Sequence, residues 1–255
     1  MSFFLRILRV FSLVAVCCSA AFADMHPSRL ALLTDNAGVT PDLAAVPERQ
    51  TSERAAPQFT AEPQASPVQP SDVPAKWREL QSRILEDEKQ ISACRQNESL
   101  CSDAARQFLS IVELGKTHEG RAQVGLINRA INMSIRPASD WAQYGYADYW
   151  ASPLQTLNSG AGDCEDYAIV KYVAFRQLGF DAGDLRLVIV HDDKHEADHA
   201  IVAVRSEQQW LILDNRTMAI LKAEDVGHYH PLFALDQQGV RKITTSASNR
   251  VIINR

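Results

Sequence analysis

Apolar residues between Lys76 and Trp150 recur every three or four positions, which is the spacing of amphipathic helices. The run "VGLINRAINMSI" continues this pattern until Pro137 interrupts it. We therefore expect helices over most of this stretch. The positions that carry the pattern are Trp77, Leu80, Ile84 and Leu85, and further along Phe108, Ile111, Val112 and Leu114.

The hydrophobic period changes after a further helix, which we expect from Asp163 to Leu178 with Gly179 as its C-terminal stop. Beyond it, "LRLVIV", "AIVAV" and "WLILD" are short β-rich runs separated by polar turns, and "PLFAL" and "VRKI" are two further candidates. Helices followed by an antiparallel sheet indicate an α+β fold.

The N-terminus has the layout of a secretory signal peptide. Arg6 and Arg9 precede an apolar run, and Ala21-Phe22-Ala23 ends it with a small-x-small cleavage signature. The apolar run is shorter than the roughly 20 residues that span a membrane. A lipoprotein is disfavoured because Val16, before the first cysteine of the Cys17-Cys18 pair, is not small. We expect residues 1–23 to be removed and the mature chain to be exported without stable membrane insertion.

Residues 24–74 are predicted to be a disordered Pro/Ala-rich linker. They contain eight prolines and few large apolar residues, so they cannot bury enough surface to offset the entropy of ordering. One domain is expected from residue 75 to residue 245, followed by a short tail over 246–255.

Charge and cysteine content narrow the class of protein. The chain has 26 Lys and Arg against 31 Asp and Glu. Loss of two arginines with residues 1–23 changes the net charge from −5 to −7, which argues against nucleic acid as a partner. Cys17 and Cys18 leave with the signal, and Cys94 and Cys101 could pair in an oxidising compartment. Cys164 remains as the odd thiol.

Cys164 is a candidate nucleophile because Asp163 is a suitable N-cap, which places the cysteine in the first turn of its helix. Unpaired backbone N–H groups there favour a thiolate and can serve as an oxyanion hole. The adjacent acids Asp163, Glu165 and Asp166 oppose that charge. The alternative is an inert buried cysteine.

His199 and Asp214 are the candidate base and orienting acid. His199 opens one predicted strand and Asp214 closes the next. A hairpin centred on Ser206 and Glu207 would place them directly opposite each other, with Cβ atoms roughly 4.5–5.5 Å apart. A one-residue shift of register would separate them. Alternatively, they are an ordinary strand-end histidine and a turn-initiating aspartate.

A second motif overlaps this one. His195, Glu196 and His199 fit H-E-x-x-H, the signature of zinc peptidases, in which a helix places both histidines on one face. The segment lies between two predicted strands, and a third ligand would have to be His228 or His230. A zinc metallopeptidase is therefore an alternative with weaker support.

The segments "GDCEDYAIVKY", "DHAIVAV" and "LILDN", in this order, resemble the bacterial transglutaminase-like cysteine proteinases, in particular their LapG-type periplasmic members. The similarity continues upstream through "NRAINMSI", Trp141 and "DYWASPLQTL", so it covers roughly Trp77 to Leu235. It implies a papain-like or transglutaminase-like core, with the cysteine on a helix packed against an antiparallel sheet.

The resemblance also implies a role for the acids. In this family the acids beside the cysteine bind calcium, which makes Asp163 and Glu165 expected ligands and Asp166 a third candidate. Carboxylate oxygens suit Ca²⁺, and the ion would cancel the negative field around the thiol. Alternatively, Asp163 caps the helix, and Glu165 and Asp166 complement its dipole.

The function implied by the resemblance is a periplasmic, calcium-dependent cysteine endopeptidase. Cys164 would be the nucleophile, His199 the general base and then acid, and Asp214 the orienting acid. The expected substrate is the N-terminal region of a large surface adhesin, cut near a pair of alanines, whose release controls biofilm attachment. The expected partner is an inner-membrane receptor that senses a cyclic dinucleotide and sequesters the protease. A transglutaminase-like acyl transferase or a non-catalytic binding module remains an alternative, and Trp150 is either a cleft or a core residue.

Overall fold

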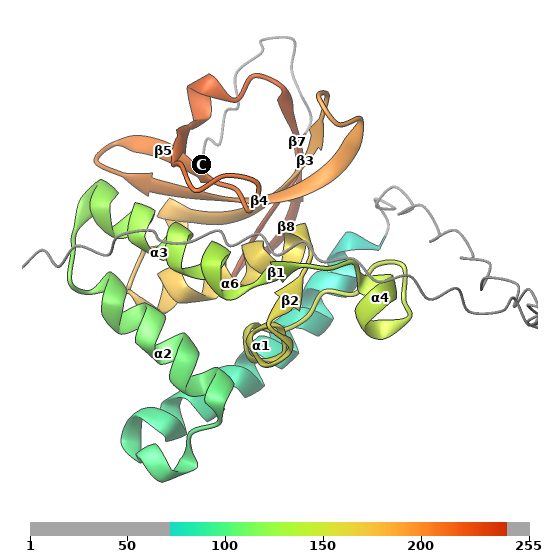
Figure 1. The fold of residues 1–255 in the computed structure, drawn as a ribbon. Coiled ribbons are helices and arrows are strands. Elements are labelled where there is room, and N and C mark those ends of the chain that lie inside the picture. The colour runs from blue at the N-terminus through green and yellow to red at the C-terminus, as the bar shows by residue number, and fades with distance from the viewer. Residues whose placement is uncertain (1–71, 244–255) are drawn as a thin grey trace, which may run out of the picture. The chain divides into compact units, whose positions relative to one another are not determined.

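Helices occupy the first part of the described chain and strands the second (Figure 1). The computed structural model describes residues 72–243. The helices are α1 (Val73–Gln96), α2 (Asp103–Gly115), α3 (Gly120–Ser134), α4 (Asp140–Tyr144), α5 (Pro153–Ser159) and α6 (Cys164–Gln177), with 3₁₀ turns η1 (Glu98–Leu100), η2 (Ala182–Asp184) and η3 (Ala223–Asp225).

The predicted signal peptide (1–23), most of the predicted linker (24–74) and the predicted tail (246–255) lie outside the described residues and stay predictions. The helix α1 begins at Val73, two residues before the expected start of the domain, because Pro74 fits the first helical turn, where its missing N–H costs nothing. Within residues 72–243, no helix has both the length and the apolar character needed to cross a membrane.

The helical periodicity predicted for residues 76–150 is confirmed by α1, α2 and α3, which bury the expected stripes. Leu85 and Leu114 are exceptions, because each lies in its helix but faces solvent, with 56% and 42% of its surface exposed. The α1 stripe instead includes Asp87, a buried carboxylate between two apolar turns.

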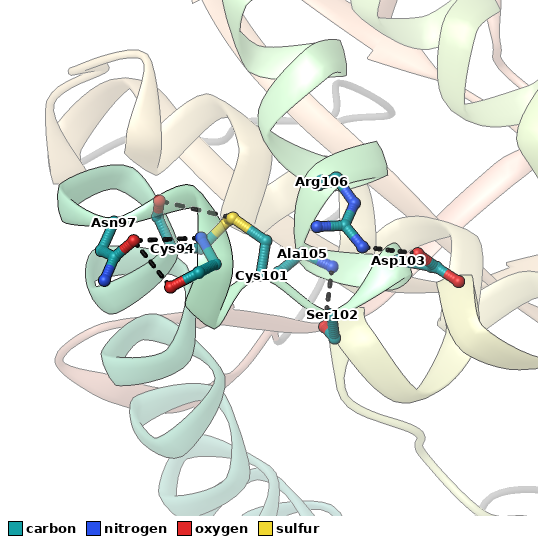
Figure 2. The surroundings of a disulfide bond; sticks show 8 residues. Cys94, Asn97, Cys101, Ser102, Asp103, Ala105 and Arg106 are labelled. Atoms are coloured by element: carbon teal, nitrogen blue, oxygen red, sulfur yellow. Dashed lines mark hydrogen bonds and ion pairs between the residues drawn. A yellow bond between two sulfur atoms is a disulfide. The ribbon is translucent and has the colours of Figure 1, made fainter.

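The corner between α1 and α2 is closed by a disulfide between Cys94 and Cys101 (Figure 2). Asn97 caps the intervening η1 turn by accepting the Ser99 backbone N–H at 3.0 Å. Ser102 then caps α2 by accepting the Ala105 N–H at 3.1 Å. The pairing is the one that the sequence allowed for an oxidising compartment.

The helix α6 follows its prediction closely. Gly179, with φ of +88°, ends it in a left-handed turn. Its N–H donates to the Arg176 carbonyl, the Phe180 N–H donates to the Phe175 carbonyl, and the two phenyl rings pack edge to face. These are the bonds and the apolar contact of a Schellman motif.

The strands form a six-stranded antiparallel sheet in the order β6-β5-β4-β3-β7-β8. The predicted runs correspond to β3 (Leu185–Asp192), β4 (Ala197–Ser206), β5 (Gln209–Leu213), β7 (Tyr229–Asp236) and β8 (Gly239–Lys242). The sequence did not indicate β6 (Leu221–Lys222) or the parallel pair of β1 (Arg136–Pro137) and β2 (Ala161–Gly162).

One face of the sheet joins the helical core, and α6 packs against β3 and β4 on this side (Figure 1). The other face carries a smaller apolar cluster that includes Ile201, Ile212 and Tyr229. Helix α6 against an antiparallel sheet is the predicted α+β arrangement, and it sets the start of α6 beside the start of β4.

Candidate active site and acidic cluster

Cys164 is the first residue of α6, and Asp163 precedes it in the N-cap position. Asp163 has the extended backbone of an N-cap, but its side chain makes no capping hydrogen bond. The Cys164 thiol is free and half-buried, and its Sγ donates to Glu165 Oε2 at 3.3 Å. The chain therefore leaves the Asp163 carboxylate available for another partner.

The surroundings of Cys164 oppose a thiolate. Burial, together with the adjacent Asp163 carboxylate, raises the pKa of the thiol to about 11. The Ala200 backbone N–H acts in the opposite direction but is weaker. The stabilisation of a thiolate expected from the start of the helix is thus outweighed by burial and by the neighbouring acids. The protonated thiol is the favoured form.

The side chains of His199 and Asp214 are hydrogen-bonded to each other, as the sequence predicted. His199 Nε2 lies 2.9 Å from Asp214 Oδ1, and both residues are almost fully buried. The other ring nitrogen, Nδ1, is buried without a hydrogen-bond partner. An ionised Asp214 carboxylate can only accept a hydrogen bond, so Nε2 of the neutral imidazole carries the hydrogen and Nδ1 presents a lone pair.

The register proposed for this hairpin is wrong by two residues. Its turn is centred on Glu207 and Gln208, both at positive φ, and Val202 pairs with Leu213. Asp214 is therefore a diagonal neighbour of His199 and not its direct partner. A two-residue shift keeps both side chains on the same face of the sheet, which preserves the contact.

Three further groups hold Asp214. Its side chain accepts the Arg216 backbone N–H at 2.9 Å and the Tyr229 hydroxyl at 2.5 Å, and its carbonyl accepts Asn132 Nδ2 at 2.9 Å. Burial alone would raise the pKa of the Asp214 carboxyl. The hydrogen bond and charge of His199, with the Arg216 N–H and the Tyr229 hydroxyl, hold this pKa well below its usual range.

Tyr229 and Asn132 were not predicted. Asn132, like Asn128 one turn earlier, is an amide on the apolar stripe of α3, and both donate to carbonyls of the segment after β5. An asparagine among the apolar positions of a helix is the sequence signal that could have indicated a buried hydrogen bond to another segment. Tyr229 comes from β7, and nothing in the sequence linked it to Asp214.

A cavity of about 310 Å³ opens at the start of α6, and Cys164 and His199 both line it. Trp150, Ile189 and Ala200 supply apolar walls, and Glu196 and Asp198 come from the hairpin that joins β3 to β4. Trp150 is only 4% exposed, so it belongs both to the cavity wall and to the core. The thiol and the imidazole thus share a space of the size that peptide side chains fill.

An acidic cluster lies next to this cavity. One carboxylate oxygen from each of Asp140, Asp163 and Glu165 lies within 4.8 Å of the other two. Asp140, from α4, was not predicted. Asp166, which was, lies outside this group and accepts the Ala151 N–H at 2.9 Å through Oδ1.

Several oxygens of these acids lack partners. Asp140 Oδ1, Asp163 Oδ1 and Asp166 Oδ2 are buried without a hydrogen bond. Burial, together with neighbouring carboxylates, raises the pKa of Asp140 to about 7 and that of Asp166 to about 8. Buried carboxylates with unpaired oxygens match the ligand set that Ca²⁺ prefers.

The zinc-peptidase motif has no helix to support it. His195 lies in the turn after β3 and bonds Asp192 through Nδ1 at 2.5 Å, while His199 lies in β4 and bonds Asp214. Of the two possible third ligands, His230 hydrogen-bonds Asp193 and His228 packs against the Tyr229 ring. The described histidines therefore do not converge on one metal position.

Comparison with known proteins agrees with this layout. Residues 89–237 match the family model of the bacterial transglutaminase-like cysteine proteinases. No curated protein matches the chain. The solved structures of Legionella pneumophila LapG include one at 24% identity, which covers 61% of this chain and 87% of LapG with a TM-score of 0.50.

The calcium-bound form of Legionella pneumophila LapG matches at 23% identity, over 65% of this chain and 92% of LapG, with a TM-score of 0.51. A third structure is of the same protein treated with EGTA. At this identity the likeness to LapG shows a shared fold. With the family match over more than half of its length, the chain belongs to the bacterial transglutaminase-like cysteine proteinases.

Proposed function

We propose that this protein is a periplasmic, calcium-dependent cysteine endopeptidase with Cys164, His199 and Asp214 as its catalytic residues. The observation that carries the proposal is the buried His199–Asp214 pair: its imidazole keeps Nδ1 without a hydrogen-bond partner, and His199 lines the same cavity as Cys164. Membership of a cysteine proteinase family supports the reaction class.

The residues support a two-stage hydrolysis. His199 Nδ1 takes the thiol proton, and the Cys164 sulfur attacks the scissile carbonyl. Asp214 stays ionised and stabilises the imidazolium, which then protonates the leaving amine as the thioester forms. Water, activated by the same imidazole, cleaves the thioester, while backbone N–H groups at the start of α6 stabilise the oxyanion.

The acidic cluster fits calcium. Asp140, Asp163 and Glu165 would hold the ion, and Asp166 lies beside them with one unpaired oxygen. When bound, Ca²⁺ would offset the negative field that these acids impose on the thiol. Glu165 also accepts a hydrogen bond from the Cys164 thiol. If Ca²⁺ engaged the Glu165 carboxylate, the thiol proton would be left for His199. The calcium-bound structure of the related LapG supports this assignment.

The substrate we propose is the N-terminal region of a large surface adhesin, cut near a pair of alanines, so that cleavage releases the adhesin and ends biofilm attachment. The proposed partner is an inner-membrane receptor that senses a cyclic dinucleotide and sequesters the protease. Both follow from the LapG-type resemblance. The Cys94–Cys101 disulfide supports an oxidising compartment such as the periplasm.

A cleavage assay tests the proposal. Purified protein is mixed with the N-terminal segment of a large exported adhesin from the same organism, with Ca²⁺ or with a chelator. We expect one cut with Ca²⁺ and none with chelator or with Cys164→Ala. Calcium-independent cleavage would refute the dependence, and cleavage by Cys164→Ala would refute the mechanism.

A further inference from the structure

The wall of the cavity that carries Trp150 is fastened by the helix α1. Arg83 Nη2 donates to the Trp150 carbonyl at 2.6 Å, and Asp87 Oδ2 accepts the Leu154 N–H at 2.8 Å. Residues four apart lie on the same face of a helix, so one face of α1 holds the chain at both ends of the segment 150–154.

Asp87 acts as the cap of α5. Ser152 occupies the N-cap position of that helix, but its side chain makes no capping bond there. The buried Asp87 carboxylate, supplied from α1, takes the N–H that a cap would satisfy. Burial raises the pKa of the Asp87 carboxyl, and the Leu154 N–H acts in the opposite direction.

A third contact fastens the same segment to the nucleophile helix. The Ala151 N–H donates to Asp166 Oδ1 at 2.9 Å, two residues after Cys164. The peptide group between Trp150 and Ala151 is therefore held by α1 at its carbonyl and by α6 at its N–H, and Trp150 lines the cavity together with Cys164 and His199.

We infer that Arg83 and Asp87 are positioning residues, which hold the Trp150 wall at the spacing that a substrate peptide requires. The inference rests on the proposed endopeptidase function. Both residues precede residues 89–237, the part that matches the family model, so the clamp adds a role for α1 to the shared catalytic core.

Paired substitutions separate positioning from simple loss of structure. Arg83→Met keeps the apolar stem but removes the donor to Trp150, whereas Arg83→Lys retains a donor. Asp87→Leu removes the acceptor, whereas Asp87→Asn retains a carbonyl oxygen for the Leu154 N–H. Arg78→Met, on the exposed face of α1, is the matched control.

We expect Arg83→Met and Asp87→Leu to lower kcat/KM by about 10- to 100-fold, mainly through KM, because the attacking group is intact and the wall is displaced. Arg83→Lys and Asp87→Asn should recover most of this loss, and Arg78→Met should match the wild type. An unchanged KM in folded Arg83→Met protein would overturn the inference. This test does not depend on Asp87→Leu, so it stands even if that variant fails to fold.

A second readout does not need proteolysis. In protein labelled with ¹⁵N-tryptophan, the Trp150 indole signal, assigned with Trp150→Phe, should shift in Arg83→Met and return in Arg83→Lys. The rate of Cys164 alkylation by iodoacetamide should stay unchanged. If the wild type cleaves no adhesin fragment, the proposed function fails, whereas an unmoved Trp150 signal rejects the clamp alone.

Discussion

The His199 imidazole lies 2.9 Å from the Asp214 carboxylate, although the two residues are not opposite each other in the β4–β5 ladder. The pair survives because a shift of two residues leaves both side chains on one face of the sheet. The Arg216 backbone N–H and the Tyr229 hydroxyl then hold the carboxylate in place, and Asn132 holds the Asp214 backbone carbonyl. The position of Asp214 beside His199 therefore depends on the residues around Asp214 as much as on the hairpin.

Replacing Asp214 with asparagine should nearly abolish catalysis. The substitution keeps the size of the side chain but removes the charge that stabilises the imidazolium, and it lets His199 adopt the wrong tautomer. In a comparable Ser-His-Asp system the loss in kcat is about 10⁴. Asp103→Asn, at an exposed position in α2, is the control. Full kcat in Asp214→Asn would remove Asp214 from the catalytic set.

The stability that Asp214 contributes should depend on pH in a defined direction. Its folded pKa lies below the unfolded value of about 3.9, so the contribution is fully present above that pH and is lost as pH falls toward the folded pKa. Thermal melts of the wild type and of Asp214→Asn should differ most above about pH 5 and converge in more acidic buffer. A constant difference across this range would contradict the assignment.

Calcium should stabilise the protein through Asp140 more than through Asp166. Asp140 belongs to the cluster with Asp163 and Glu165, whereas Asp166 uses one oxygen for the Ala151 N–H. At a ligand concentration of 100 times Kd, binding adds about 2.7 kcal/mol to the free energy of unfolding. Melts of chelator-stripped protein should show this gain in the wild type and a much smaller one in Asp140→Asn.

The comparison with Asp166→Asn decides between the two ligand sets. We expect this variant to keep most of the calcium-induced shift, and Mg²⁺ to replace Ca²⁺ poorly because it demands stricter octahedral geometry. A normal shift in Asp140→Asn together with its loss in Asp166→Asn would favour the ligands expected from sequence alone.

Removal of the disulfide should destabilise the corner between α1 and α2. Loop-closure entropy for so short a loop predicts a loss of about 2.5 kcal/mol for the Cys94→Ser, Cys101→Ser double variant. The matched control is the wild type melted with and without a reductant. Since the bond lies far along α1 from Arg83, proteolysis at low temperature should be unaffected. Equal melting temperatures for oxidised and reduced protein would contradict the pairing.

Much of the fold was predictable because it depends on local pattern. The stripe of α6, its Gly179 stop and the alternation from helices to strands are readable within short windows of sequence. The centre of the β4–β5 turn was not readable, because Glu207 and Gln208 adopt positive φ without the Gly or Asn that normally marks such a turn.

The candidate site was readable only where its residues adjoin a motif. Asp163 and Glu165 flank Cys164, but Asp140 comes from a five-residue helix earlier in the chain. Its approach to the cluster is decided by tertiary packing. The same holds for Arg83 and Asp87, whose partners are backbone groups of residues 150–154. Almost every residue has the same backbone N–H and C=O groups, so the sequence does not show which residue a side chain binds through its backbone.

The central claim is that Cys164 performs peptide hydrolysis, and cleavage in H₂¹⁸O tests it most directly. Wild-type protein with Ca²⁺ should cut the adhesin segment and leave ¹⁸O in the new C-terminal carboxyl group, since water resolves the thioester. Glu196→Gln should do the same, because Glu196 has no role in this mechanism, and Cys164→Ala should leave the substrate intact. Cleavage that survives Cys164→Ala and is lost in Glu196→Gln, or a product joined to an amine in place of ¹⁸O, would contradict the account.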